Sequence, residues 1–516
     1  MRRGPVTSRL ALALLAVMLF AIPARSTAGG KVVESDEELT AALLDSIRTD
    51  PPRLRMFLQR MPKGGDLHNH LSGSIYAEDF LAWGAEKGFC IDAASYAITS
   101  PPCDGKVRIP IEDIIAGDPF RYGQIVTALS TRGMEAGFGD PKVPGFERFF
   151  RSFDALGPVP SVTIAQALAQ NRTDAASEGV SYRELITLPR AVIDLYPPAM
   201  AAPGNGADFD ALSNALGPHL PAAVAAARRS FDQIEGEAAA LNDCATNSPK
   251  PACAVTIRYQ AVAVRNVPPA KVFAALSFAF AIAEADPRFV GVNIAAPEHD
   301  PIAIRDYALH MRMLAYLHAR HPNIPLSLHA GELTLGLVPP HALRSHIGQA
   351  VGIAGARRIG HGVDLPYEDG AGDLLRRMAR DRVAVEINLT SNAVILGVKG
   401  KDHPLPVYLA SQVPVVLSTD DQGVTRSDMT NEYLRAVQEL GLTYRQLKQI
   451  VRNSLEYAFV SGRSLWVSGP GSAKVAACAS PPQAAGAPCA SFLADNEKAR
   501  LQWSLEQKLA EFERER

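Results

Sequence analysis

The stretch Asp66-Leu67-His68-Asn69-His70-Leu71-Ser72-Gly73-Ser74 decides how the rest of the chain is interpreted. An apolar residue with two histidines at i and i+2 indicates the end of a β-strand, because side chains two apart on a strand point to the same face. His68 and His70 can therefore bind one metal ion from one side, with each nitrogen about 2 Å from it. Taken alone, such a pair is weak evidence for a metal site.

Three later segments strengthen the metal interpretation, because each places polar residues directly after a short apolar run. They are Ser327-Leu328-His329-Ala330-Gly331-Glu332, Arg358-Ile359-Gly360-His361-Gly362 and Leu417-Ser418-Thr419-Asp420-Asp421. In a barrel of parallel strands, the catalytic groups lie at the carboxyl ends of the strands. The sequence therefore predicts that these segments and the histidine pair together form one zinc site.

Composition limits the class of protein. The chain has 516 residues, of which 47% are hydrophobic and 21% are charged, so it can bury a large core and is not of a disordered class. Its formal net charge of -2 argues against binding nucleic acid or anionic membranes through bulk charge. Length alone allows two or three domains, but α/β barrels commonly exceed 250 residues as one unit.

Residues 1–28 have the pattern of a cleaved secretory signal peptide. Arg2, Arg3 and Arg9 precede an apolar run over 10–22, and Ser26-Thr27-Ala28 offers small residues for cleavage. The run is too short for a comfortable membrane span. We therefore expect a secreted or periplasmic protein that is soluble and free of the membrane after cleavage.

Cysteine usage agrees with export. The six cysteines form three local couples, each around sequence rich in Pro, Ser or Asn: Cys90 with Cys103, Cys244 with Cys253, and Cys478 with Cys489. Six cysteines allow 15 connectivities, but this clustering favours three sequential disulfides that staple surface loops. Three pairs of free thiols are the alternative. None of the spacings is C-x-x-C, which disfavours a cysteine zinc site.

The hydrophobic pattern predicts an α/β fold, a (β/α)8 TIM barrel with insertions over its carboxyl-terminal face and extra terminal helices. After the opening strand, strands are expected over 181–188, 255–264, 289–295, 324–329, 357–360, 383–388 and 413–419. Helices are expected over 32–60, 162–178, 221–241, 302–319, 370–380 and 428–440. Eight strands that alternate with helices are typical of this barrel.

The same pattern divides the chain into consecutive parts. A signal peptide over 1–28 precedes a helical extension over 29–61. The barrel occupies 62–462, with insertions at about 85–160 and 190–253, and a loop and helix over 463–516 end the chain. The first insertion carries an aromatic run, Phe146, Phe149, Phe150 and Phe153, which is interpreted as core rather than as a platform for a ligand.

With these motifs in this order, the chain resembles the adenosine deaminase family of metal-dependent amidohydrolases. The resemblance runs from about residue 62 to 459 and rests on separated motifs. They are Leu67-His68-Asn69-His70-Leu71, Ser181-Tyr182-Arg183-Glu184-Leu185, His329-Ala330-Gly331-Glu332, Ile359-Gly360-His361-Gly362, Leu389-Thr390-Ser391-Asn392 and Ser418-Thr419-Asp420-Asp421. The signal peptide and stapled insertions resemble, more loosely, the secreted growth-factor-related branch of that family.

The resemblance implies hydrolytic deamination of adenosine or a related 6-aminopurine nucleoside with one Zn²⁺ per chain. Zinc lowers the pKa of bound water to about 7 and so supplies hydroxide. The implied metal ligands are His68, His70, His329 and Asp420. In the implied catalytic roles, His361 orients and deprotonates the water, Glu332 holds a proton against purine N1, and Asp421 contacts the N7 edge. The implied substrate contacts are His70, Ser72, Ala296 and Asp421.

Local structural roles are the alternatives for these residues. His361 between two glycines can be a turn residue, Glu332 can cap a helix, and Asp420-Asp421 can be a charge pair at a helix start. Asn392 is interpreted as stabilising the turn after its strand, and the histidines outside the motifs are assigned surface or core roles. For the whole protein, the alternatives are another amidohydrolase activity or a non-catalytic binding or signalling protein. The sequence does not determine the oligomeric state.

Two positions depart from the family pattern and concern the substrate. The family has an acidic residue where this chain has Ser72, so a sugar hydroxyl there loses a charge-assisted hydrogen bond. Ala296 stands where the family has a glycine whose N–H meets purine N3. Its methyl disfavours positive φ, and Pro297 restricts it further. We expect the chemistry to be retained and the sugar or purine preference to differ.

Overall fold

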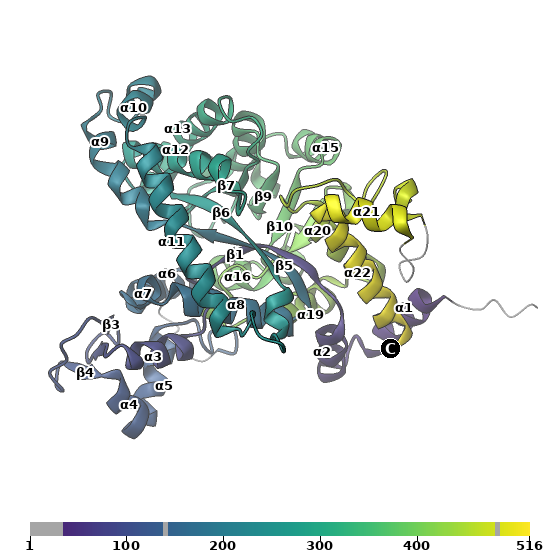
Figure 1. Cartoon of the computed structure of the whole chain (residues 1–516), viewed down its shortest axis with the longest axis horizontal. Coiled ribbons are helices and arrows are strands. Elements are labelled where there is room, and N and C mark those ends of the chain that lie inside the picture. Colours follow the sequence, from purple (N-terminus) through teal and green to yellow (C-terminus); the bar gives the residue numbers. More distant parts are fainter. Residues whose placement is uncertain (1–34, 138–142, 480–485) are drawn as a thin grey trace, which may run out of the picture. The chain divides into compact units, whose positions relative to one another are not determined.

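The centre of the structure is a closed barrel of eight parallel strands. Helices lie around these strands in Figure 1. In chain order they are β1 (Gly64–His70), β5 (Val180–Thr187), β6 (Thr256–Val264), β7 (Phe289–Ala295), β8 (Ser327–Ala330), β9 (Arg358–His361), β10 (Ala384–Ile387) and β11 (Val415–Leu417). The first four pair in chain order, and so do the last four. Parallel bridges between Asn69 and Asp420 and between Val292 and Leu326 join the two halves into a ring. The predicted (β/α)8 barrel is confirmed.

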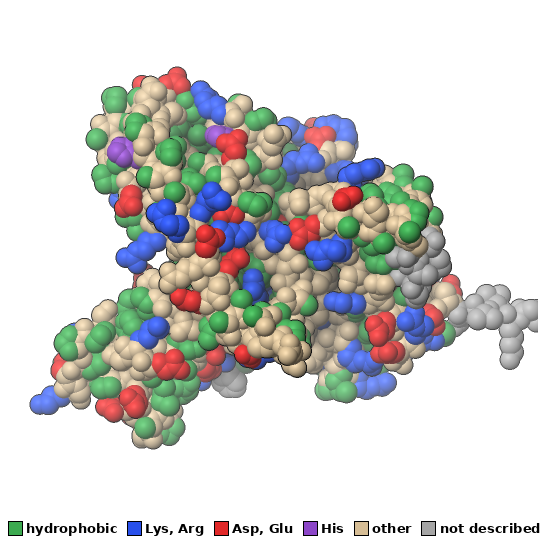
Figure 2. Space-filling model, viewed as in Figure 1, with side chains coloured by type: hydrophobic (Ala, Val, Ile, Leu, Met, Phe, Trp, Pro, Cys, Tyr) green, Lys and Arg blue, Asp and Glu red, His purple; other side chains and the backbone are tan. Residues whose placement is uncertain are grey.

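A computed structural model of the chain describes residues 35–137, 143–479 and 486–516. The predicted signal peptide over 1–28 lies outside the described residues. Within the described ranges, none of the helices combines the length and apolar character needed to cross a membrane. On the face in Figure 2, basic and acidic side chains are interspersed, in keeping with the small net charge of -2.

Helices alternate with the barrel strands and cover them. They are α8 (Ile164–Ser177), α11 (Leu220–Leu241), α12 (Pro269–Ala285), α13 (Pro301–His318), α15 (Ala371–Asp381), α17 (Leu405–Ala410), α19 (Met429–Leu440) and α20 (Tyr444–Glu456). Of these helices, α12 was not predicted from the sequence. This helix packs on β6 and β7 and is covered by α9 (Tyr196–Ala201), α11 and α13, so its sequence is hydrophobic on every side and lacks a helical period.

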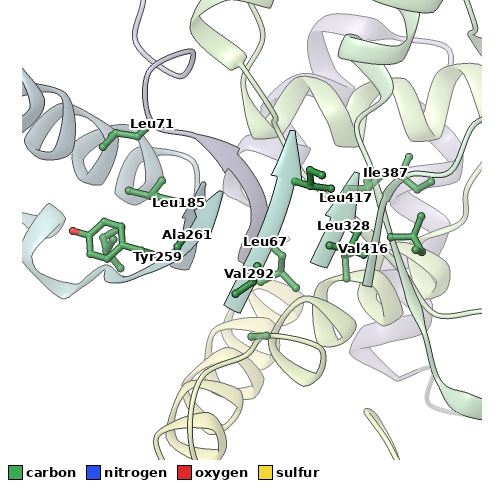
Figure 3. Packing of buried hydrophobic residues seen from close by; sticks show 14 of the residues in the cluster. Leu67, Leu71, Leu185, Tyr259, Ala261, Val292, Leu328, Ile387, Val416 and Leu417 are labelled. Atoms are coloured by element: carbon green, nitrogen blue, oxygen red, sulfur yellow. The ribbon is translucent and has the colours of Figure 1, made fainter. Parts of the chain in front are cut away.

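Successive side chains along the barrel strands alternate between an apolar layer and the polar interior of the barrel. Figure 3 shows Leu67, Val292 and Leu328 in the apolar layer. In contrast, Arg358 on β9 forms ion pairs with Glu184 on β5 and Glu386 on β10, and all three are buried. Because β5 and β9 are not neighbours in the barrel, the pair that joins them crosses the interior. The strands therefore present polar side chains to the interior of the barrel.

The first insertion contains a small sheet that was not predicted from the sequence. A three-stranded antiparallel sheet consists of β2 (Cys90–Asp92), β3 (Ile98–Thr99) and β4 (Arg108–Pro110). Strands of two or three residues are too short to show a hydrophobic period. The aromatic run lies on α6 (Gly145–Leu156). Phe149 there is buried and belongs to the same apolar cluster as Val363, Val394 and Val424, as the core interpretation predicts.

The three sequential disulfides are confirmed, and they join Cys90 to Cys103, Cys244 to Cys253 and Cys478 to Cys489. At the amino-terminal side of the barrel, the predicted helical segment forms two helices, α1 (Asp36–Ile47) and α2 (Pro51–Arg60). After the barrel in the chain, α21 (Ala487–Asp495) and α22 (Glu497–Arg514) follow the stapled loop, and α22 packs against α1. One helix was expected over 463–516, whereas the structure has both α21 and α22 in this part of the chain.

Candidate active site

Four side chains of the ligand type converge at the carboxyl ends of β1, β8 and β11. His68 Nε2 lies 3.0 Å from His329 Nε2, and His70 Nε2 lies 3.1 Å from the same atom. Asp420 Oδ1 lies 3.3 Å from His70 Nε2 and 3.5 Å from His68 Nε2. The structure thus brings together the four side chains that the sequence analysis named as candidate ligands, with one atom of each within 4.8 Å of the others.

Hydrogen bonds on the far side of two of these rings fix which nitrogen carries the proton. The Glu386 carboxylate lies 2.7 Å from His68 Nδ1, and Asn293 Oδ1 lies 2.9 Å from His329 Nδ1. Both acceptors require Nδ1–H, so the lone pair of each ring is on Nε2 and points into the cluster. Glu386 and Asn293 were not predicted from the sequence; a polar residue inside an apolar strand indicates an inward-facing position but not its partner.

The arrangement fits a tetrahedral metal ion. Four ligands at about 2.0–2.1 Å from such an ion lie about 3.3 Å from one another, and the four separations given above are 3.0–3.5 Å. Three imidazole nitrogens and one carboxylate oxygen form a donor set that suits Zn²⁺. Without a cation, the Nε2 lone pairs of His68 and His329 face each other beside the Asp420 carboxylate in a buried space.

Glu332 is held beside this cluster by a tight turn. Gly331 has φ +77°, and a Cβ there would lie 2.4 Å from Asp364 Oδ1 and 2.9 Å from Ile347, so the turn requires glycine. The Glu332 carboxyl is buried. Burial, with the nearby charge of Asp420, raises its pKa well above the ordinary value. Burial and the Asp420 charge therefore both favour the protonated form of Glu332.

A second glutamate, Glu298, positions the Glu332 turn. Its carboxylate accepts hydrogen bonds from the backbone N–H of Gly331 at 3.1 Å and of Glu332 at 2.9 Å. His346 Nδ1 lies 2.6 Å and Arg265 Nη1 3.6 Å from the same carboxylate. Burial opposes its ionisation, but Arg265 and His346 outweigh burial and lower the pKa of Glu298 to about 2. Glu298 and His346 are further residues to which the sequence analysis gave no role in the site.

His361 ends β9 in a left-handed conformation, with φ +70°. Its Nε2 is buried and has no hydrogen-bond partner among the described residues. It lies 3.7 Å from Glu332 Oε1 and 3.9 Å from Asp420 Oδ2. Burial lowers the pKa of His361 to about 3, so the ring is neutral. Asn392, which the sequence analysis placed in a turn, lies behind this ring with its side-chain amide 3.0 Å from His361 Nδ1.

Asp421 borders the same space from the side of the Ser72-Gly73 turn. A Cβ on Gly73 would lie 1.6 Å from Asp421 Oδ1, so this close approach requires glycine. Burial and the neighbouring Asp420 charge raise the pKa of Asp421 well above the ordinary value. Its Oδ1 has no hydrogen-bond partner among the described residues, whereas Ser72 is exposed. Asp421 therefore offers a buried polar atom that a ligand can satisfy.

Ala296 follows β7 with φ +92°, although the sequence analysis expected its methyl group to disfavour positive φ. The residue before a proline is restricted further, and such a conformation costs of order 1–3 kcal/mol. His361 and Asp420 also have positive φ, at 70° and 56°. Backbone strain of this kind clusters at functional sites. Three of the residues predicted to form the site therefore lie in strained backbone.

Part of the chain is similar to known adenosine deaminases. Residues 219–464 match the family model for adenosine deaminase. An adenosine deaminase from Shewanella loihica is 34% identical over 143 residues, which are 28% of this chain and 40% of that protein. One from Aliivibrio fischeri is 36% identical over 140 residues, or 27% of this chain and 39% of that protein. The chain thus spans about two fifths of the length of these relatives.

A solved structure supports the fold. The crystal structure of Arabidopsis ADAL complexed with GMP superposes on this chain with a TM-score of 0.50 and 18% sequence identity. The superposition covers 78% of this chain and 94% of that one. At this level of identity the likeness shows the barrel architecture.

Proposed function

We propose that this chain, in which residues 219–464 match the family model for adenosine deaminase, hydrolytically removes the 6-amino group of adenosine or a related 6-aminopurine nucleoside. One observation carries the proposal. Three imidazole Nε2 atoms and one carboxylate oxygen converge beside a buried glutamic acid whose pKa is raised. In the reaction the C6–N bond breaks, a C6–O bond forms, and one water molecule is consumed for each ammonia released.

The residues of the converged cluster, His68, His70, His329 and Asp420, would hold one Zn²⁺. When bound, zinc lowers the pKa of a coordinated water to about 7 and so provides hydroxide near neutral pH. Glu386 keeps His68 in the tautomer that presents its lone pair to a metal, and Asn293 does the same for His329. Such outer partners affect metal affinity 10- to 100-fold when they are mutated.

Glu332 supplies the acid of the proposed reaction. A carboxyl group that keeps its proton can hydrogen-bond to purine N1 and draw electron density from C6, which makes C6 easier to attack. Glu298 holds the backbone of Glu332 and so fixes where that proton is presented. Asp421, whose pKa is also raised and whose Oδ1 lacks a partner, can donate a hydrogen bond to N7. His361 Nε2 is left to orient the attacking water.

Substrate selection is proposed to differ from that of the relatives at the sugar and at the far edge of the purine. Ser72 is exposed and carries no charge, so a substrate with a modified 5′ position loses no charge-assisted contact there. A similarly folded protein was crystallised with GMP, a purine nucleotide. We therefore include 5′-substituted adenosines among the candidate substrates.

Export of the protein is also proposed. Three disulfides are expected to form and persist in oxidising compartments. The signal-like sequence of residues 1–28 supports the same location, secreted or periplasmic. Cell fractionation with a tagged full-length chain tests this, because recovery only in the cytoplasm with the leader intact would contradict it.

The test of the function is a substrate panel with the purified, zinc-loaded protein. Adenosine, deoxyadenosine, adenine and methylthioadenosine are incubated separately, and purine absorbance and ammonia are followed together. The proposal expects equal amounts of ammonia and 6-oxopurine from at least one of them. Zinc-loaded protein that binds an aminopurine without releasing ammonia would instead favour a binding protein, and the absence of both binding and turnover would favour another amidohydrolase activity.

A further inference from the structure

A chain of hydrogen bonds runs away from the site behind His361. Asn392 Nδ2 lies 3.0 Å from His361 Nδ1, and Asn392 Oδ1 lies 3.1 Å from His403 Nε2. The backbone N–H of Leu405, in the first turn of α17, donates to His403 Nδ1 at 3.1 Å. His361, Asn392 and His403 are each at most 2% exposed. Water therefore does not compete for these contacts.

The direction of every bond in this chain follows from its outer end. A backbone N–H can only donate, so His403 Nδ1 is unprotonated and the proton of the neutral ring is on Nε2. His403 Nε2–H requires an acceptor, which fixes Oδ1 of Asn392 on that side and its NH₂ group on the other. That NH₂ group can only donate, so His361 Nδ1 is an acceptor and its proton is on Nε2.

We propose that Asn392 and His403 are positioning residues that hold His361 as the neutral Nε2–H tautomer, so that His361 acts in the site as a hydrogen-bond donor. The tautomer follows from the hydrogen bonds alone, whereas its effect on turnover rests on the proposed function. With a proton already on Nε2, the ring has no lone pair toward Glu332 and Asp420. His361 Nε2 then cannot accept a proton from water. It therefore cannot be the general base, which is the role that the family resemblance implied for His361.

Two further features support the arrangement. Asn388 Nδ2 lies 3.4 Å from the same His361 Nδ1, so the amide groups of two asparagines present donors to one acceptor. Burial, together with the positive charge of Arg435, lowers the pKa of His403 to about 4, which keeps that ring neutral near pH 7. Asn392 itself lies in a π-helical turn, η6 (Asn392–Leu396), a local irregularity that is frequent at functional sites.

Three substitutions separate positioning from simple packing. Asn392→Asp replaces the donor that faces His361 Nδ1 with an acceptor of the same shape. The aspartate therefore favours a proton on Nδ1 of His361. His403→Leu removes the donor that orients the Asn392 amide, whereas His403→Gln retains a side-chain N–H. The control is His341→Gln, at an exposed histidine outside the site.

The readout is ¹⁵N NMR of zinc-loaded, histidine-labelled protein, with the His361 signals assigned by their loss in His361→Gln. We expect an unprotonated Nδ1 and a protonated Nε2 in the native protein and in His341→Gln, and a protonated Nδ1 in Asn392→Asp. A protonated Nδ1 in the native protein would overturn the proposal. If Asn392→Asp does not fold, Asn392→Ala serves instead, and an unaltered tautomer population in it would also count against the proposal.

Turnover of an aminopurine completes the test. Loss of the correct tautomer in Asn392→Asp is expected to lower kcat by about 100-fold or more, because a misplaced proton on a catalytic histidine is costly. His403→Leu is expected to lower kcat about 10-fold with KM unchanged, and His403→Gln to restore most of it. Native kcat in Asn392→Asp would overturn the positioning role. An Nε2–H tautomer in a protein that deaminates no aminopurine would instead refute the proposed function and leave the tautomer assignment intact.

Discussion

Glu298→Gln is expected to be among the most disruptive single-atom changes in this protein. One oxygen of the native carboxylate accepts from Gly331 N–H and faces His346, and the other accepts from Glu332 N–H and faces Arg265. A glutamine has one oxygen and one NH₂ group in their place. In either orientation of the amide, its NH₂ group, which can only donate, faces two other donors. The site is buried, so these donors are left without acceptors.

The magnitude follows from the pKa of Glu298. Its lowering from an ordinary 4.5 to about 2 corresponds to about 3 kcal/mol of unfolding free energy at neutral pH, at 1.36 kcal/mol per pH unit. This stabilisation is fully present above pH 4.5 and is lost as the pH falls toward 2. Removing one partner of a buried ion pair typically costs about 3–5 kcal/mol of stability, which agrees with the value from the pKa. We therefore expect Glu298→Gln to lower the unfolding free energy by about 3–5 kcal/mol at pH 7.

Urea unfolding of the metal-stripped and the zinc-loaded protein measures this loss, and it should appear in both because Glu298 is not among the candidate ligands. The matched control is Glu284→Gln, a glutamate 64% exposed that pairs with His321 at 3.1 Å. An exposed pair of this kind is worth about 0–1 kcal/mol. A Glu298→Gln protein no less stable than Glu284→Gln at pH 7 would refute the argument, since the carboxylate would then not be holding the Glu332 turn.

The remaining predictions concern the metal, a buried acid and the sugar. His68→Ala or Asp420→Ala should lower zinc content by metal analysis along with turnover, whereas Glu332→Gln should retain zinc and lose turnover; full activity in Glu332→Gln would mean the acid is misassigned. Burial raises the pKa of Glu432 to about 7 despite hydrogen bonds that lower it. Its neutral form therefore stabilises the fold fully below pH 4.5, and this contribution declines as the pH rises toward 7. The unfolding free energy of Glu432→Gln, relative to that of the native protein, should then rise by up to about 3 kcal/mol between pH 4.5 and pH 8. If this relative unfolding free energy is the same at both pH values, the prediction is wrong. Ser72→Asp should raise the preference in kcat/KM for a free 5′-hydroxyl by about tenfold to a hundredfold; unchanged preference in Ser72→Asp would mean that the sugar is bound elsewhere.

The sequence predicted the barrel and the convergence of its motifs because both depend on periodic, local signals. His68 and His70 share a face through the two-residue period of a strand, and His329, His361 and Asp420 each follow an apolar run that ends a strand. The order of the strands in a (β/α)8 barrel then brings these ends together. Sequential pairing of the cysteines was likewise predictable, because each couple is close in the chain.

The supporting residues were not predicted, because their partners are far away in the chain. Glu298 contacts Glu332 across 34 residues, and Glu386 contacts His68 across 318. In a single sequence, a glutamate inside an apolar strand gives no indication of which atom it faces. Asn392 and His403 are only 11 residues apart, but a π-helical turn and a 3₁₀ turn lie between them, and neither has a clear sequence signature. α12 was missed because it is apolar all round.

The most direct test of the central claim is a zinc titration of the metal-stripped protein, with ammonia release from the best aminopurine as the readout. The account predicts no release without metal, and a linear rise in rate that stops at one zinc per chain. The same titration of His329→Ala should give no rise over that range. Full ammonia release by protein shown by metal analysis to contain no metal would contradict the account, as would a zinc-saturated protein that releases none from any aminopurine.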